Sequence, residues 1–125
     1  MKKAVSLLFV VAALYDGLLG LLFLFAGASA FQWFGVTPPN HWGYLQFPAA
    51  LLIVFAIMFA MVAKNPVANR NLIPYGILLK VAYCSVFFFH WFTTGLPNIW
   101  KPFAVCDLLF AVAFIAAAIA LRRQA

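Results

Sequence analysis

The sequence predicts an all-α integral membrane protein built as a bundle of four transmembrane helices. Its 125 residues are 68% hydrophobic and only 8% charged, and their mean hydropathy is +1.08. A soluble domain carries about 25% charged residues. The apolar residues also fall into four long runs. So few polar side chains cannot cover a water-soluble surface, which excludes a soluble enzyme, a secreted disulfide scaffold and a disordered segment.

The four apolar runs define the predicted spans of a single transmembrane domain, residues 1–125. A spanning helix needs about 20 mostly apolar residues to cross a hydrocarbon core of roughly 30 Å. The runs cover about residues 4–31, 44–63, 72–92 and 102–121, and the first is long enough to tilt or to extend past the interface. Pro48, Pro74 and Pro102 fall near predicted helix starts, where a missing N–H costs little. Short connections favour a compact bundle.

The basic residues predict how the chain is oriented. An excess of Lys and Arg marks the cytoplasmic side of transmembrane helices. Lys101 is expected on the outer side, whereas six residues flank the opposite side: Lys2, Lys3, Lys64, Arg70, Arg122 and Arg123. Both termini and the middle loop are therefore expected in the cytoplasm. Such a rim has too few charges to bind nucleic acid.

A sequence repeat marks the two expected outer turns. Six residues recur 58 positions later, in the pattern F-x-W-F-x4-P-N-x-W: Phe31, Trp33, Phe34, Pro39, Asn40 and Trp42, then Phe89, Trp91, Phe92, Pro97, Asn98 and Trp100. We interpret this as a repeat of two tandem helical hairpins running in the same direction. The alternative is convergence, because tryptophans collect at membrane interfaces and Pro and Asn favour turns.

Three charged residues lie within the predicted spans, and we expect them to meet. At 1.5 Å per residue, Asp16, Lys80 and Asp107 fall in one layer around or just outside the midplane. Each shares its helical stripe mostly with small residues, which mark helix contacts in membranes. A central charge costs about 2.5–3.5 kcal/mol on insertion scales, so pairing is expected. One lysine neutralises only one aspartate, which leaves the second carboxyl as a candidate to stay protonated.

Two interpretations of these charges remain open: a ligand-binding or proton-coupling site, and a buried ion pair that only sets helix register. Tyr83, one turn from Lys80, is the aromatic residue expected beside such a site. Aromatic rings with a few convergent polar groups are typical of a cavity for a hydrophobic ligand.

The outer turns hold a second group of candidates, which are all four tryptophans and both histidines: Trp33, His41, Trp42, His90, Trp91 and Trp100. We expect the histidines to form interfacial hydrogen bonds. A zinc site is not expected, because zinc prefers four ligands and the turns hold no other strong ones. No catalytic motif is present, so an enzyme is the less favoured interpretation.

Two segments carry a family resemblance: PVANRNLIPYGILLK (residues 66–80) and PNIWKPFAVCD (residues 97–107). They resemble small bacterial inner-membrane proteins of uncharacterised function, and the layout of the whole chain more loosely resembles the DoxX-like group of four-helix proteins. The resemblance implies four helices in the bacterial inner membrane. In some relatives it implies association with quinone-linked redox complexes, so a quinone is the cofactor to consider. It carries over no catalytic residue.

Three functions follow as hypotheses. The leading one is a non-enzymatic inner-membrane protein that binds a lipophilic small molecule or lipid. In one version of this hypothesis, the protein is an accessory subunit of a larger membrane complex. The second is a dimeric proton-coupled transporter in which the two aspartates share a proton. The third is a scaffold subunit whose charges only set packing. Ligand retention, pH-dependent flux and partner capture distinguish the three.

Overall fold

The computed structural model describes residues 2–124, and this range contains helices and no strand. Four helices are long and apolar enough to cross a membrane: α1 (Lys2–Phe25), α3 (Gly43–Lys64), α4 (Ile73–Phe92) and α5 (Lys101–Gln124). Three short elements connect them: α2 (Gly27–Trp33) and the 3-10 turns η1 (Arg70–Leu72) and η2 (Asn98–Trp100). The predicted fold class is confirmed, and the chain is a multi-pass membrane protein.

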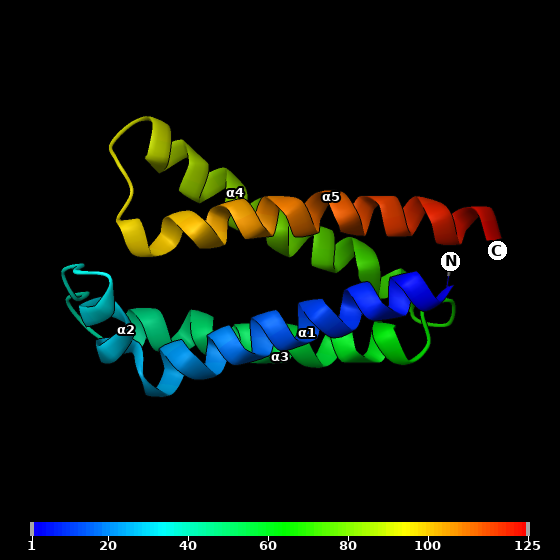
Figure 1. The fold of residues 1–125 in the computed structure, drawn as a ribbon, viewed down its shortest axis with the longest axis horizontal. Helices are drawn as coiled ribbons and strands as arrows, with labels where there is room; N and C mark the ends of the chain where they lie inside the picture. Colours follow the sequence, from blue (N-terminus) through cyan, green and yellow to red (C-terminus); the bar gives the residue numbers. More distant parts are fainter. Residues whose placement is uncertain (1, 125) are drawn as a thin grey trace.

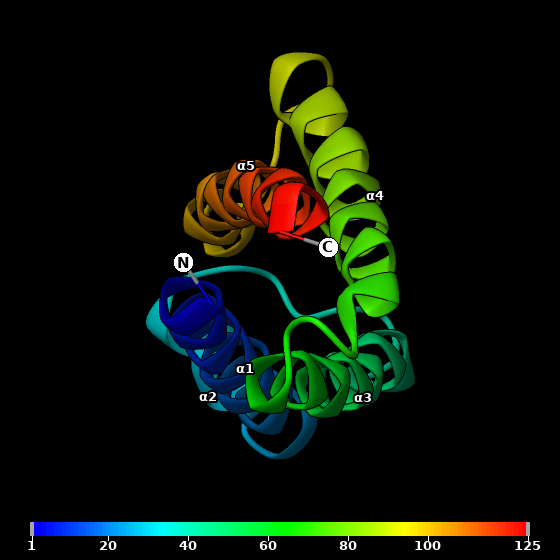
Figure 2. The same cartoon turned by 90° about the vertical axis from the view of Figure 1, so that its right-hand side faces the viewer.

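The four long helices form two hairpins, as Figure 1 shows. Hairpin one consists of α1, α2 and α3 (residues 2–64), and hairpin two of α4 and α5 (residues 73–124). Both chain ends and the α3–α4 connection lie at one end of the bundle, which we call the basic end, and both hairpin turns lie at the opposite, outer end. Figure 2 looks along the bundle. It shows that α4 begins beside α3 and that the outer end of α4 lies away from hairpin one.

The first predicted span is not one continuous helix. It breaks at Ala26, whose backbone (φ −132°, ψ 29°) leaves the helical region, and the short helix α2 follows. Small residues allow such a bend, and Gly27 makes it tight. A side chain on Gly27 would come within 2.8 Å of Leu45 and within 3.4 Å of Trp42. Residues 4–31 therefore divide into a spanning helix and a short cap over the outer end of the bundle.

The prolines follow the prediction in two places and differ in one. Pro74 and Pro102 lie at the second residue of α4 and α5, where no helical N–H is needed. Pro48 instead lies inside α3, which begins at Gly43. The carbonyl of Tyr44 therefore lacks its usual N–H donor four residues ahead. The cost is small because Tyr44 and Pro48 are both exposed on the bundle surface.

Close backbone approach holds hairpin one together. A Cβ atom added to Gly20 of α1 would lie 2.7 Å from the carbonyl oxygen of Ala49 and 2.9 Å from Ile53, both on α3. Gly17 faces Ala56 of α3 at an ordinary 3.4 Å. In the bilayer the hydrophobic effect does not drive helices together, so they associate largely through dispersion contacts. Small residues let the two backbones approach closely enough to make such contacts along their length. Hairpin one is therefore a tight pair of helices.

Aromatic side chains join the two hairpins near the basic end. Phe9 of α1 stacks on Phe114 of α5 with centroids 4.6 Å apart, and Phe59 of α3 lies 5.2 Å from Phe114. All three are completely buried. A second cluster closes the outer end, built around Phe23, Ala30, Phe31, Leu45, Ala49 and Ile99. The space between these two clusters holds the candidate site.

Candidate functional site

The three intramembrane charges meet between the hairpins. Lys80 Nζ on α4 donates to Asp16 Oδ1 on α1 at 2.9 Å and to Asp107 Oδ1 on α5 at 3.0 Å. Asp16 and Lys80 have no exposed surface, and Asp107 keeps 7%. We call this group the charge triad. Its Asp16–Lys80 bond is the one side-chain hydrogen bond between the two hairpins within residues 2–124.

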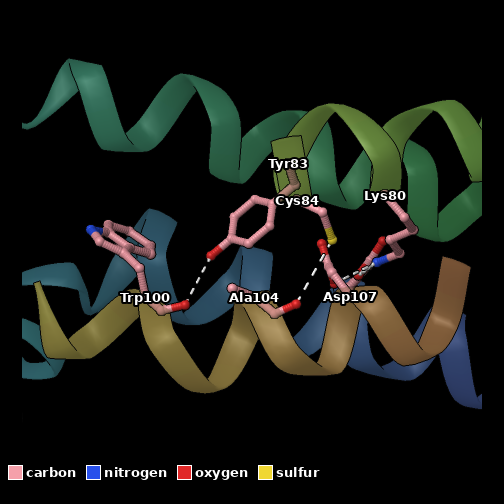
Figure 3. A network of polar contacts seen from close by, with 7 residues as sticks. Lys80, Tyr83, Cys84, Trp100, Ala104 and Asp107 are labelled. Atoms are coloured by element: carbon pink, nitrogen blue, oxygen red, sulfur yellow. Dashed lines mark hydrogen bonds and ion pairs between the residues drawn. The ribbon is translucent and has the colours of Figure 1, made fainter. Parts of the chain in front are cut away.

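Aromatic rings enclose the rest of the lysine ammonium group. Lys80 Nζ lies 5.1 Å from the ring centroid of Phe110, 5.5 Å from Tyr15 and 5.8 Å from Phe59. Each ring face presents negative charge density to the cation. Lys80 is thus held by two carboxylates and three rings, which leaves it no free direction towards a ligand. Figure 3 shows its side chain reaching from α4 to Asp107 on α5.

The carboxylates are less completely satisfied than the lysine. Across the described residues, Lys80 is the only hydrogen-bond partner of either aspartate. Asp16 Oδ2 is buried and has no partner, and the hydroxyl of the neighbouring Tyr15 is in the same state. Two carboxylates and one ammonium sum to one net negative charge. An uncompensated charge is expensive at this depth, so uptake of one proton or of another cation would lower the free energy of the triad.

A cavity of about 330 Å³ lies beside the triad. Its volume is within the range of small-molecule sites, about 300–1,000 Å³. Aspartates 16 and 107 supply its acidic groups, and the other walls are aromatic or aliphatic. All four long helices line it, through residues that include Leu19, Phe23, Tyr44, Pro48, Leu52, Phe55, Leu79, Tyr83, Phe87, Trp100 and Phe103.

The mouth of this cavity faces the side of the bundle. Three residues of α3 that line it, Tyr44, Pro48 and Leu51, are exposed on the lipid-facing surface. The diverging helix α4 supplies the opposite wall through Leu79 and Tyr83. The aromatic cluster around Phe9 fills the basic end beside the cavity, and the cluster around Phe31 lies at its outer end. The side opening past the exposed residues of α3 is therefore the path that a molecule dissolved in the bilayer would take.

Tyr83 lies in the cavity wall next to the triad, and its ring contacts the ring of Phe87 at a tilt of 31°, with centroids 4.1 Å apart. Its hydroxyl donates to the backbone carbonyl of Trp100 at 3.4 Å, and Cys84 Sγ lies 3.8 Å from the carbonyl of Ala104 (Figure 3). Both contacts join α4 to the residues at the start of α5. The Tyr83 hydroxyl thus holds the outer half of hairpin two together and points away from the carboxylates.

The predicted outer aromatic group divides into two parts. Trp42 and Trp100, which correspond in the repeat, are partly buried and pack on Phe31 with centroids 5.6 and 5.9 Å away. Trp33 is 71% exposed, and Trp91 stacks on Phe88 near Lys101, at the periphery. The correspondence fails at Phe31 and Phe89, since one is buried and the other is 62% exposed. Trp100 thus lines the cavity and Trp42 packs on the outer cluster next to it, whereas Trp33 faces outwards and Trp91 lies against Lys101.

The two histidines make local contacts in exposed positions. The backbone N–H of Gly43 donates to His41 Nδ1 at 2.9 Å, and His90 Nδ1 lies 3.0 Å from the hydroxyl of Thr94. The residues described here contain no group of three or more His, Cys, Asp or Glu side chains placed to bind a metal ion. Neither histidine reaches the charge triad or its cavity.

The sequence did not predict several of the residues that line the cavity. Phe23 lies seven positions after Asp16, and Phe103 lies four positions before Asp107, so each ring shares the helical stripe of its aspartate. The helical spacing that predicts inward-facing aspartates therefore predicts inward-facing rings as well. The α3 residues, such as Leu52 and Phe55, carry no comparable signal because α3 has no polar residue at this depth.

Comparison with protein families, with characterised proteins and with solved structures finds no match to this chain.

Proposed function

We propose that this chain is a non-enzymatic membrane protein that binds a lipophilic small molecule or lipid in the cavity between its hairpins. One observation carries the proposal: a space of about 330 Å³ with apolar walls, a lipid-facing mouth and two carboxylates at one end. A charge arrangement that only sets register needs no such space, because close-packed interiors leave few voids larger than a water molecule.

A matched pair of tryptophan variants tests this proposal. Leu52 lines the cavity, whereas Leu18 of α1 is 64% exposed and takes no part in it. We expect native mass spectrometry of the wild-type protein, released from mild detergent, to show a bound molecule in stoichiometric amount. Leu52→Trp should fill the cavity and lose that molecule, and Leu18→Trp should retain it. Equal retention by both variants, or a wild-type protein without ligand, contradicts the proposal.

The proposed location is the bacterial inner membrane, with both termini in the cytoplasm. The placement of six basic residues at one end of the bundle supports this orientation, and the DoxX-like resemblance of the layout supports the bacterial inner membrane as the location. Cytoplasmic-side reporters fused to either end should be active. A reporter fused within the turn around Pro39 should be active only if it works outside the cytoplasm, and the reverse pattern would contradict the orientation.

Proton-coupled transport is the second candidate function, and the net negative charge of the triad favours it. A proton and another cation would compete for such a site, and proton-coupled exchange depends on this competition. In liposomes, the wild-type protein should then move a substrate at a rate that depends on the pH gradient, and Asp16→Asn should not. A ligand-free protein without flux, which captures a partner instead, would favour the scaffold hypothesis.

A further inference from the structure

From the triad and its cavity, we infer that the ligand is a lipophilic cation with an N–H donor, such as a hydrophobic amine, and that it displaces the proton of the two carboxyls when it binds. This inference rests on the proposed function, because it names the class of molecule that the cavity accepts.

The polar groups of the cavity are the first reason. At the triad end of the cavity a ligand meets carboxylate oxygens, because Lys80 Nζ donates to both aspartates and the Tyr83 hydroxyl donates to the carbonyl of Trp100. Asp107, whose side chain keeps 10% of its surface exposed, is the carboxylate that a ligand reaches, and Asp16 is completely buried beside it. A quinone carbonyl only accepts hydrogen bonds and cannot donate to an ionised carboxylate. An ammonium group supplies that donor.

Charge is the second reason. With both aspartates ionised the triad carries one excess negative charge, and an anionic ligand would add to it. A cationic ligand brings the sum to zero and replaces the proton that otherwise does so. Because the site is neutral with either partner, binding of one cation releases one proton.

The walls of the cavity suit such a ligand as well. Five of the aromatic rings that line it lie on the four long helices and one 3-10 turn: Phe23, Phe55, Phe87, Phe103 and Trp100. Ring faces attract a cation while they also pack against its apolar body. The triad itself uses this contact already, since three rings surround Lys80 Nζ.

The surroundings of the carboxylates determine the expected pH dependence. The titratable groups near them are Tyr15 on α1, Lys80, Tyr83 and Cys84 on α4, and Cys106 on α5, while Tyr44 of α3 lies at the cavity mouth. Lys80 is committed to both carboxylates. The carboxyl proton is therefore the one that a cation displaces, and amine binding should strengthen as the pH rises from acid to neutral.

Three probes with one apolar body and different head groups test the inference: phenylbutylamine, phenylbutanol and phenylbutyrate. Isothermal titration of the purified protein in nonionic micelles, with empty micelles as the blank, measures each affinity. Phenylbutylamine should bind tightest and phenylbutyrate should not bind. Repeating the amine titration in buffers of different ionisation enthalpy should show one proton released for each amine bound.

Asp16→Asn is the decisive variant, because the amide keeps the shape of the side chain and removes the excess charge. Its affinity for phenylbutylamine should fall by more than about tenfold, the range for losing one partner of a buried charge pair, and proton release should disappear. Asp107→Asn, the same change on α5, should have the same two effects. If Asp16→Asn does not fold, Asp107→Asn and the three-probe ranking on the wild-type protein still decide the inference.

The outcomes separate this inference from the proposed function. If phenylbutanol or phenylbutyrate binds as tightly as the amine, and Leu52→Trp but not Leu18→Trp abolishes that binding, the cavity binds ligands but does not select cations. Full amine affinity in Asp16→Asn overturns the inference in the same way. If none of the three probes binds the wild-type protein and no ligand is retained on purification, both proposals fail.

Discussion

The two hairpins solve the problem of helix contact in lipid in different ways. In hairpin one, α1 and α3 approach so closely at Gly20 that no side chain fits, and the contact continues along both helices. In hairpin two, α4 crosses α5 and diverges from the bundle at its outer end (Figures 1 and 2). The Lys80–Asp107 bond is one of the contacts that join these two helices. Small residues make one hairpin tight, and a charge pair with aromatic rings leaves the other open.

The difference between the hairpins explains why a cavity exists. A second tight glycine contact between α4 and α3 would close the side of the bundle. Gly76 of α4 does occur near α3, but the ring of Phe59 already occupies the space beside it, 2.7 Å from where a Cβ would lie. Aromatic side chains therefore fill the space between the hairpins near the basic end, and the space beyond them remains open as far as Trp100.

Removal of the triad lysine should produce the largest effect, because it breaks the polar contact between the hairpins. Lys80→Met leaves two buried carboxylates without a cation, and loss of one partner of a buried ion pair costs about 3–5 kcal/mol. SDS titration in mixed micelles measures the free energy of unfolding. The triple variant Asp16→Asn, Lys80→Met, Asp107→Asn should recover most of the loss. If Lys80→Met unfolds like the wild-type protein, the triad does not hold the hairpins together.

A pair of glycine substitutions should distinguish the tight points of hairpin one. Gly20→Ala places a methyl group 2.7 Å from the carbonyl oxygen of Ala49, and such overpacking costs about 1–3 kcal/mol. Gly17→Ala meets Ala56 at 3.4 Å and should change the unfolding free energy much less. The same SDS titration compares the two. Equal effects would mean that α1 and α3 do not depend on close approach at Gly20.

The smallest expected effect compares one side-chain-to-backbone hydrogen bond in each hairpin. Ser6 Oγ of α1 donates to the carbonyl of Ala63 of α3 at 2.7 Å, whereas the Tyr83 bond to Trp100 is 3.4 Å long. Ser6→Ala should lower the unfolding free energy by about 0.6 kcal/mol, the average for hydrogen bonds between membrane helices. Tyr83→Phe should lower it by less, and the reverse order would contradict the assignment of hairpin two as the looser pair.

The sequence predicted the helices and the meeting of the charges better than the shape of the site. Long apolar runs and the 3.6-residue period place Asp16, Lys80 and Asp107 on inward faces, because a charge in lipid has few alternatives. The break at Ala26 and the position of Pro48 inside α3 depend on contacts with Leu45 and on surface exposure. No local pattern encodes those contacts.

The cavity was unpredictable for a related reason. Its size depends on how far α4 diverges from α3, which is a property of crossing angles and of rings such as Phe59. The repeat predicted two hairpins with turns at the same end, and the structure has that arrangement. It did not predict that the two copies would pack differently, with Phe31 buried and Phe89 exposed.

The Asp16–Lys80 bond also has a consequence for the order in which the protein is made. Its two partners are 64 residues apart, so Asp16 leaves the ribosome well before the lysine does. During that interval Asp16 lies between apolar segments of α1 and has no counterion. The insertion machinery, or a proton on the carboxyl, must accommodate it until α4 arrives. Biogenesis of the first hairpin therefore ends only when the second one enters the bilayer.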